Sequence, residues 1–161
     1  MASGPRRHVD ILALGFARLG GIGAIPRAPG TWASLAAICL APFIFLPLPL
    51  FPRFLFLAAI YIPGVLACAR AEEILGEKDP PQVVIDEFFG QLLVCLPFAG
   101  LETEYLAAAF ILFRVFDIAK PWPVSAAEKA PGGTGIMLDD LVAALYAMIC
   151  LAALRWATGR P

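Results

Sequence analysis

Charged side chains are scarce in this 161-residue sequence: only 16 % of its residues are Asp, Glu, Lys or Arg, while 60 % are apolar. A soluble domain carries charge on about a quarter of its residues. The shortage excludes an ordinary soluble domain and favours an integral membrane protein. The length suits one domain with one core, and no internal repeat divides it. We therefore expect a single membrane domain over residues 1–161, with residues 1–10 as a polar N-terminal arm.

The sequence also lacks a basic excess, since 12 Lys and Arg stand against 13 Asp and Glu. A nucleic-acid partner requires a basic face, so that class of ligand is excluded. The single histidine, His8, lies in the polar arm, and no Ser-His-Asp or Cys-His set is available for nucleophilic catalysis. The four cysteines do not have zinc-site spacing, and we interpret them as small buried hydrophobic residues: Cys39, Cys68, Cys95 and Cys150.

What the sequence does contain is five apolar stretches. Several are shorter than the roughly 20 residues of an ideal membrane span, and prolines interrupt the end of the first. Short or broken helices still cross a membrane when they are tilted or when their polar ends line a cavity. The expected fold is an all-α helical membrane bundle of about five apolar helices, some short or broken. The stretches cover residues 32–50, 54–69, 83–101, 105–118 and 136–156.

Basic residues predict the orientation of this bundle. Arg6, Arg7, Arg18 and Arg27 precede the first stretch, which indicates a cytoplasmic N-terminus by the positive-inside rule. If all five stretches cross, four polar segments meet on the cytoplasmic side. These segments are 26–34, 70–91, 114–123 and 131–140.

Two acidic pairs, Asp86-Glu87 and Asp139-Asp140, stand near the starts of apolar stretches. Ionisable groups in such segments persist mainly when they are paired, metal-bound or functional. Four converging carboxylates offer the oxygen ligands that a hard cation such as Mg²⁺ prefers. For the first pair, a salt bridge to Arg114 is the structural alternative.

Two helix starts suit an anion such as phosphate. Thr31 is the expected N-cap of the first helix, and its hydroxyl and the adjacent backbone amides are candidate phosphate donors. Gly133 belongs to a glycine-rich loop before the second acidic pair, where backbone amides can also bind phosphate. The alternatives are a plain capped helix start and a flexible linker. Asp79 is interpreted as no more than a cap of the helix that follows it.

Arg114, Asp117 and Lys120 follow one another at intervals of three residues, which aligns them along one helical face. An ion ladder is the structural interpretation. The functional one assigns Arg114 or Lys120 to substrate phosphate, and Asp117 to metal or to orienting the two bases.

Together these blocks resemble the bacterial phosphatidylglycerophosphatase A family: APGTWASLAA, DPPQVVIDEFFGQ, FRVFDIAKPWP and GGTGIMLDDLVAALYA. The resemblance covers residues from about 11 to 156 and is looser over residues 20–25 and at Pro81. It implies magnesium-dependent hydrolysis of phosphatidylglycerophosphate to phosphatidylglycerol and phosphate, in phospholipid biosynthesis. It also implies a multi-pass protein of the bacterial inner membrane whose active site faces the cytoplasm. The implied site residues are Thr31, Asp86, Glu87, Gln91, Arg114, Asp117, Lys120, Asp139 and Asp140.

The expected mechanism gives each group a role. One carboxylate orients or deprotonates the attacking water, although an aspartyl-phosphate intermediate is the chemical alternative. The basic side chains and helix amides bind the phosphate oxygens. The expected metal ligands and catalytic residues are Asp86, Glu87, Asp139 and Asp140, with Asp117 also catalytic; the phosphate-binding residues are Thr31, Arg114, Lys120 and Gly133.

Two other functions stay open on the sequence alone. One is a phosphatase of another lipid or of a soluble phosphomonoester. The other is a non-enzymatic cation-handling membrane protein whose carboxylates line an ion path, although an ion path needs polar groups at several depths and these acids cluster near one interface. The expected partners are the lipid substrate and the membrane, with no nucleic acid, and the oligomeric state is left open.

Overall fold

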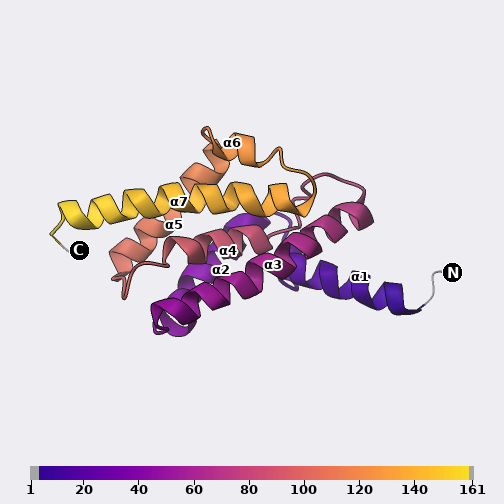
Figure 1. Cartoon of the computed structure of the whole chain (residues 1–161), viewed down its shortest axis with the longest axis horizontal. Coiled ribbons are helices and arrows are strands. Elements are labelled where there is room, and N and C mark those ends of the chain that lie inside the picture. Colours follow the sequence, from indigo (N-terminus) through magenta and orange to yellow (C-terminus); the bar gives the residue numbers. More distant parts are fainter. Residues whose placement is uncertain (1–3, 160–161) are drawn as a thin grey trace.

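The computed structural model describes residues 4–159, and within that range the chain forms helices and no strand (Figure 1). Five of these helices overlap the five apolar stretches, and the helical structure confirms the all-α fold class. They are α2 (Pro29–Ile44), α3 (Leu50–Leu75), α4 (Ile85–Val94), α5 (Thr103–Ala119) and α7 (Gly133–Ala157).

Three elements were not predicted: α1 (Gly4–Ala17), the 3₁₀ turn η1 (Ile22–Ala24) and the short α6 (Val124–Ala127). The expected polar arm of residues 1–10 overlaps α1, and its residues 1–3 lie outside the described range. α1 packs against α3, and Asp10 pairs with Arg70 at 2.7 Å. Its apolar residues were missed because basic and polar residues precede them.

Several helix boundaries differ from the prediction: α3, for example, spans Leu50–Leu75 where residues 54–69 were expected. α2 begins at Pro29 with Ala28 as its N-cap, so the assignment of Thr31 as N-cap was wrong. Proline suits the first helical position because its φ is already helical and its missing N–H would have no partner there. α4 ends at Val94, although the apolar stretch continues to residue 101. The chain turns over residues 95–97, where Pro97 cannot donate a helical hydrogen bond.

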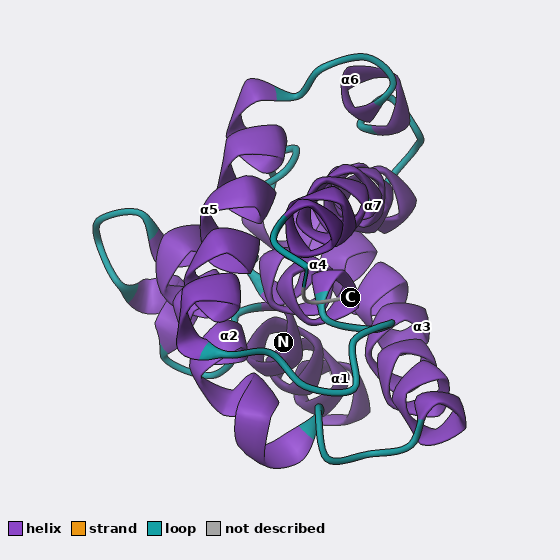
Figure 2. Ribbon diagram, turned by 90° about the vertical axis from the view of Figure 1, so that its left-hand side faces the viewer, coloured by secondary structure: helices purple, strands orange, loops and turns teal. Residues whose placement is uncertain are grey.

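α4 is the central helix. It packs against α2, α3, α5 and α7, and the end-on view shows it among them (Figure 2). Gly90 permits this packing, because a Cβ there would lie 2.6 Å from the Phe113 ring of α5. Gly133 has the same role between α7 and α3, since its Cβ would lie 2.0 Å from the Val65 carbonyl oxygen.

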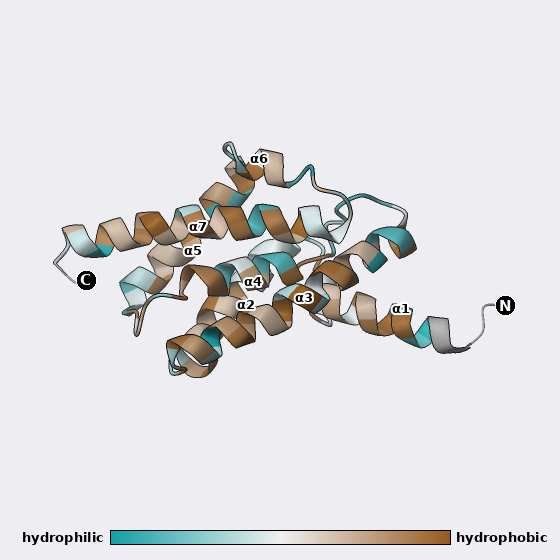
Figure 3. Cartoon of the chain, viewed as in Figure 1, coloured by the Kyte–Doolittle hydropathy of each residue, from teal (hydrophilic) through white to brown (hydrophobic). Residues whose placement is uncertain are grey.

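Two helices, α3 and α7, are long and apolar enough to cross a membrane, and α2 is a shorter apolar helix. Hydrophobic residues run along these helices, whereas hydrophilic ones concentrate in loops and near helix ends (Figure 3). Large apolar side chains on the outer faces are exposed, among them Phe43, Leu66 and Ile149. With 10 residues, α4 is about 15 Å long, half of a hydrocarbon core of ~30 Å. A crossing at each of the five stretches therefore stays a prediction.

Candidate functional site

The helix ends meet around a cavity of about 290 Å³. Its wall is built from the start of α2, the loop before α4, the first turn of α4, the end of α5 and the second turn of α7. These are the four polar segments that the sequence assigned to one side of the membrane. Eight ionisable side chains line the cavity: Asp79, Asp86, Glu87, Arg114, Asp117, Lys120, Asp139 and Asp140.

Three of the four predicted metal ligands converge in this cavity. Asp86, Glu87 and Asp140 each offer a carboxylate oxygen, and these oxygens lie within 4.8 Å of one another. One oxygen of each, Asp86 Oδ1, Glu87 Oε2 and Asp140 Oδ2, is buried without a hydrogen-bond partner among the described residues. Unpartnered buried carboxylate oxygens are costly, and a hard divalent cation bound among these three residues would offset that cost. The donor set therefore fits such an ion.

Asp139, the fourth predicted ligand, points to a different partner. Its Oδ2 accepts a hydrogen bond from Lys120 Nζ at 2.7 Å, and its Oδ1 accepts one from the backbone N–H of Asp140 at 3.0 Å. Adjacent residues on a helix point about 100° apart, so Asp139 and Asp140 serve different neighbours. Asp139 is thus a partner of Lys120, and the convergent group contains Asp140.

Lys120 stands at the end of α5 and faces two carboxylates. Besides Asp139 it pairs with Glu128 at 3.2 Å. Burial acts to lower the pKa of Lys120, but the hydrogen bonds and charges of Asp139 and Glu128 outweigh it and raise the pKa above its ordinary value. The ammonium group therefore stays charged at any physiological pH.

Arg114 lies one and a half turns earlier on α5. Its guanidinium pairs with Asp117 at 2.5 Å and lies 3.8 Å from Glu87. The i+3 pair of the predicted ladder is thus present, as is the predicted contact of the first acidic pair with Arg114. Lys120 leaves the ladder and reaches across to α7. Two cations are in this way held at the cavity wall by Asp117 and Asp139.

Glycine at position 30 positions Glu87. A Cβ on Gly30 would lie 1.8 Å from Glu87 Oε1, so only glycine lets this carboxylate lie against the first turn of α2. Asp86 and Glu87 also occupy the first turn of α4. Carboxylates are favoured at helix N-termini, where the backbone dipoles are positive.

Three residues of the predicted set do not line the cavity. Thr31 lies in the first turn of α2, and Gly133 is buried against α3. Their role in phosphate binding stays a prediction. Gln91 lies one turn beyond Glu87, fully buried, and neither atom of its side-chain amide has a hydrogen-bond partner among the described residues.

Asp79 is the residue that the sequence reasoning missed. It lines the cavity, whereas α4 begins only at Ile85, so Asp79 does not cap that helix. Its backbone has φ of +49° and its N–H donates to Glu72 Oε1 at 3.0 Å. The available signal was its position before Pro80 and Pro81, which belong to a turn that precedes α4.

Comparison with known proteins agrees with the resemblance of the four sequence blocks. A family model described as phosphatidylglycerophosphatase A matches residues 15–155. A Haemophilus influenzae protein named phosphatidylglycerophosphatase A is 38 % identical over 149 residues, which are 92 % of this chain and 89 % of the relative. An Escherichia coli protein of the same name is 37 % identical over 138 residues, 83 % of this chain and 75 % of the relative.

A Bacteroides thetaiotaomicron protein named "Putative phosphatidylinositol-3-phosphatase" is 37 % identical over 145 residues, 86 % of this chain and 91 % of the relative. No solved structure matches the chain.

Proposed function

The chain belongs to the phosphatidylglycerophosphatase A family, and from that membership we propose that it hydrolyses phosphatidylglycerophosphate to phosphatidylglycerol and phosphate. It is a phosphoric monoester hydrolase, as the family is. The observation that carries the proposal is the cavity in which three unpartnered carboxylate oxygens lie beside two cationic side chains. A phosphomonoester needs positive charge around it. Arg114 and Lys120 provide part of that charge, and a cation bound by the three carboxylates would provide the rest.

The proposed cofactor is Mg²⁺, held by Asp86, Glu87 and Asp140. The argument is electrostatic: six carboxylates line the cavity beside two bases, which would repel a phosphate dianion unless a cation is also bound. When bound, the ion neutralises phosphate charge and acts as a Lewis acid on the phosphoryl group.

The protein side chains carry the remaining tasks. Arg114 and Lys120 bind the non-bridging phosphate oxygens, whose charge grows in the transition state. Asp117 and Asp139 hold these two cations in position. A carboxylate of the group Asp86, Glu87 and Asp140 accepts the proton of the attacking water. The released alcohol is the glycerol hydroxyl of phosphatidylglycerol.

The protein is proposed to reside in the bacterial inner membrane with the cavity at the cytoplasmic surface. α3 and α7 supply apolar length for spanning, and the arginines before α2 favour that orientation. The lipid tails would then stay in the bilayer while the head group reaches the cavity. The acids lie around one cavity at the helix ends, and this clustering favours an enzyme over an ion path, which needs polar groups at several depths.

Phosphate release from phosphatidylglycerophosphate by the purified protein tests the proposal. We expect release with Mg²⁺, and loss of release when a chelator removes the metal. Asp86→Asn should lower kcat by about 100-fold or more, because it removes a charge from the buried donor set. Glu77→Gln is the matched control, since Glu77 is exposed and outside the cavity. No release by the wild type, or an Asp86→Asn variant as active as Glu77→Gln, would contradict the proposal.

A second candidate substrate class has one observation in its favour, the relative named for phosphatidylinositol 3-phosphate. That lipid and phosphatidylglycerophosphate have the same arrangement of phosphates: a phosphodiester joins the diacylglycerol to a head group that carries one phosphomonoester. A panel with both lipids, phosphatidic acid and glycerol 3-phosphate distinguishes the candidates by kcat/KM.

A further inference from the structure

A second cavity of about 330 Å³ adjoins the acidic one, and Pro29 and Pro81 line both. It lies between the end of α1, the η1 turn and the segment before α4. No described carboxylate lines it, and Arg18 is the charged side chain in its wall. Next to a strongly acidic cavity, the chain thus forms a hollow of opposite charge.

The charge of Arg18 is not neutralised by a carboxylate among the neighbouring described residues. Its Nε is buried without a hydrogen-bond partner among them, while its carbonyl oxygen accepts the N–H of Gly23 at 2.8 Å. Gly23 also lets the η1 turn contact the segment that contains Gln82, because a Cβ at Gly23 would lie 2.1 Å from the carbonyl oxygen of Gln82. Only glycine lets these two segments approach so closely.

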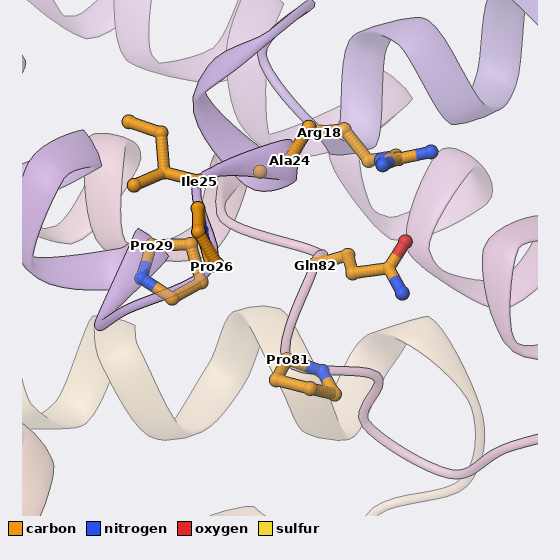
Figure 4. A pocket seen from close by; sticks show the side chains of 8 residues that line it. Arg18, Ala24, Ile25, Pro26, Pro29, Pro81 and Gln82 are labelled. Atoms are coloured by element: carbon orange, nitrogen blue, oxygen red, sulfur yellow. The ribbon is translucent and has the colours of Figure 1, made fainter.

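The cavity has a polar and an apolar side. Figure 4 shows the guanidinium of Arg18 and the amide of Gln82 extending in the same direction, with Ile25, Pro26 and Pro29 on the other side. A guanidinium and an amide N–H are donors that suit a phosphodiester anion. The apolar side suits the carbon atoms that flank such a group.

The proposed substrate carries two phosphates joined by a three-carbon glycerol unit, one a terminal phosphomonoester and the other an internal phosphodiester. Resting on the proposed function, we infer that the second cavity binds the phosphodiester while the acidic cavity holds the phosphomonoester. Arg18 is the cationic contact and Gln82 a neutral donor. Together, Arg18 and Gln82 would select lipids whose head group is attached through a phosphodiester over lipids that carry only a phosphomonoester.

Kinetics with two lipids test this inference. Phosphatidic acid keeps the acyl chains and the phosphomonoester but has no phosphodiester. Arg18→Gln should raise KM for phosphatidylglycerophosphate about tenfold, the value of one hydrogen-bonded charge, and change kcat/KM for phosphatidic acid by less than about twofold. Arg18→Lys should recover part of the loss. Arg27→Gln is the matched control, because Arg27 is exposed and lines neither cavity.

Inhibition by phosphatidylglycerol gives a second measurement. This lipid has the phosphodiester and no phosphomonoester, so it should inhibit phosphatidic acid hydrolysis about tenfold more weakly in Arg18→Gln than in the wild type. Equal inhibition in both, or equal losses on both substrates, would overturn the inference. Equal effects of Arg18→Gln and Arg27→Gln would also overturn it, because they would indicate general attraction of anionic lipid.

The two failures are distinguishable. A wild type inactive on phosphatidylglycerophosphate but active on phosphatidic acid contradicts the proposed function. Arg18-dependent inhibition by phosphatidylglycerol would still support the phosphodiester site in that case.

Discussion

At the scale of single residues, Arg53 stabilises the end of the bundle opposite the acidic cavity. It is buried, and its guanidinium donates to the carbonyl oxygens of Leu48 at 2.8 Å, Leu96 at 3.0 Å and Leu46 at 2.5 Å, and also to that of Phe98. These carbonyls belong to the turns that end α2 and α4. Arg53 thereby replaces the helical partners that both turns lose.

Removing this side chain should be costly. Arg53→Met leaves several buried carbonyl oxygens unpaired, and we expect a loss of on the order of 3 kcal/mol in the free energy of unfolding. Arg70→Met is the control, because Arg70 forms only partly exposed ion pairs, with Asp10 and Glu73, and such a pair contributes about 0–1 kcal/mol. Denaturant unfolding in detergent measures both. Equal losses in the two variants would contradict this role of Arg53.

A second prediction for a single residue concerns Lys120 and the proposed hydrolysis. Lys120→Gln should lower kcat/KM by about 10- to 100-fold, because it removes the positive charge that would bind the phosphate and leaves Asp139 without its ion-pair partner. Lys129→Gln, at an exposed position, should leave kcat/KM unchanged.

The raised pKa of Lys120 adds a pH criterion. A base with a raised pKa keeps its proton until the pH passes above its ordinary value of about 10.4. Deprotonation of Lys120 should then cause no loss of wild-type activity between pH 7 and about pH 9.5, which the pH dependence of kcat/KM measures.

At the scale of elements, the approach of α2 to α4 decides the geometry of the acidic group. Gly30→Ala puts a methyl group into the space of Glu87, so this carboxylate must move or the two helices must separate. We expect at least about a tenfold loss of Mg²⁺ affinity and of kcat, with unchanged helix content by circular dichroism. Isothermal titration and phosphate release measure the two losses.

Gly15→Ala is the control for that substitution, since nothing lies within 4 Å of a Cβ at Gly15 in α1. Alanine is the better helix former by about 1 kcal/mol, so this variant should be as active as the wild type and no less stable. A Gly30→Ala protein with wild-type Mg²⁺ affinity would show that Glu87 does not depend on this contact.

At the scale of the whole molecule, the four polar segments should face the cytoplasm. In a variant whose native cysteines are replaced, a cysteine at Glu77, in the loop after α3, should react in intact cells only with membrane-permeant reagents. A cysteine at Gly100, in the loop before α5, should react with impermeant ones, because that loop lies at the other end of α4. The reverse labelling pattern would contradict the proposed orientation.

The cysteines illustrate how far composition predicts environment. Cys68 and Cys95 are buried as expected, but Cys39 on α2 is exposed and Cys150 on α7 is only partly buried. An apolar run in a sequence indicates contact with either core or lipid, and only the packing of α2 decides which face meets α4. The same reason explains why Thr31, in the first turn of α2, does not line the cavity.

The sequence by itself determined that the chain is a bundle of apolar helices, because that depends on local composition and on prolines and glycines. It also predicted that the acids at 86–87 and 139–140 lie at one end of the bundle, and all four line the same cavity. It did not determine α1, whose apolar face is short and follows polar residues.

Only the tertiary structure decided which carboxylates converge. Asp140 lies close to Asp86 and Glu87, whereas Asp139 pairs with Lys120. Asp79, in the loop between α3 and α4, also lines the acidic cavity. Neighbours along a helix are separated by rotation, and residues far apart in sequence are joined by helix packing. The second effect depends on the distance and angle between helices, to which Gly30, Gly90 and Gly133 contribute through close contacts that no local pattern records.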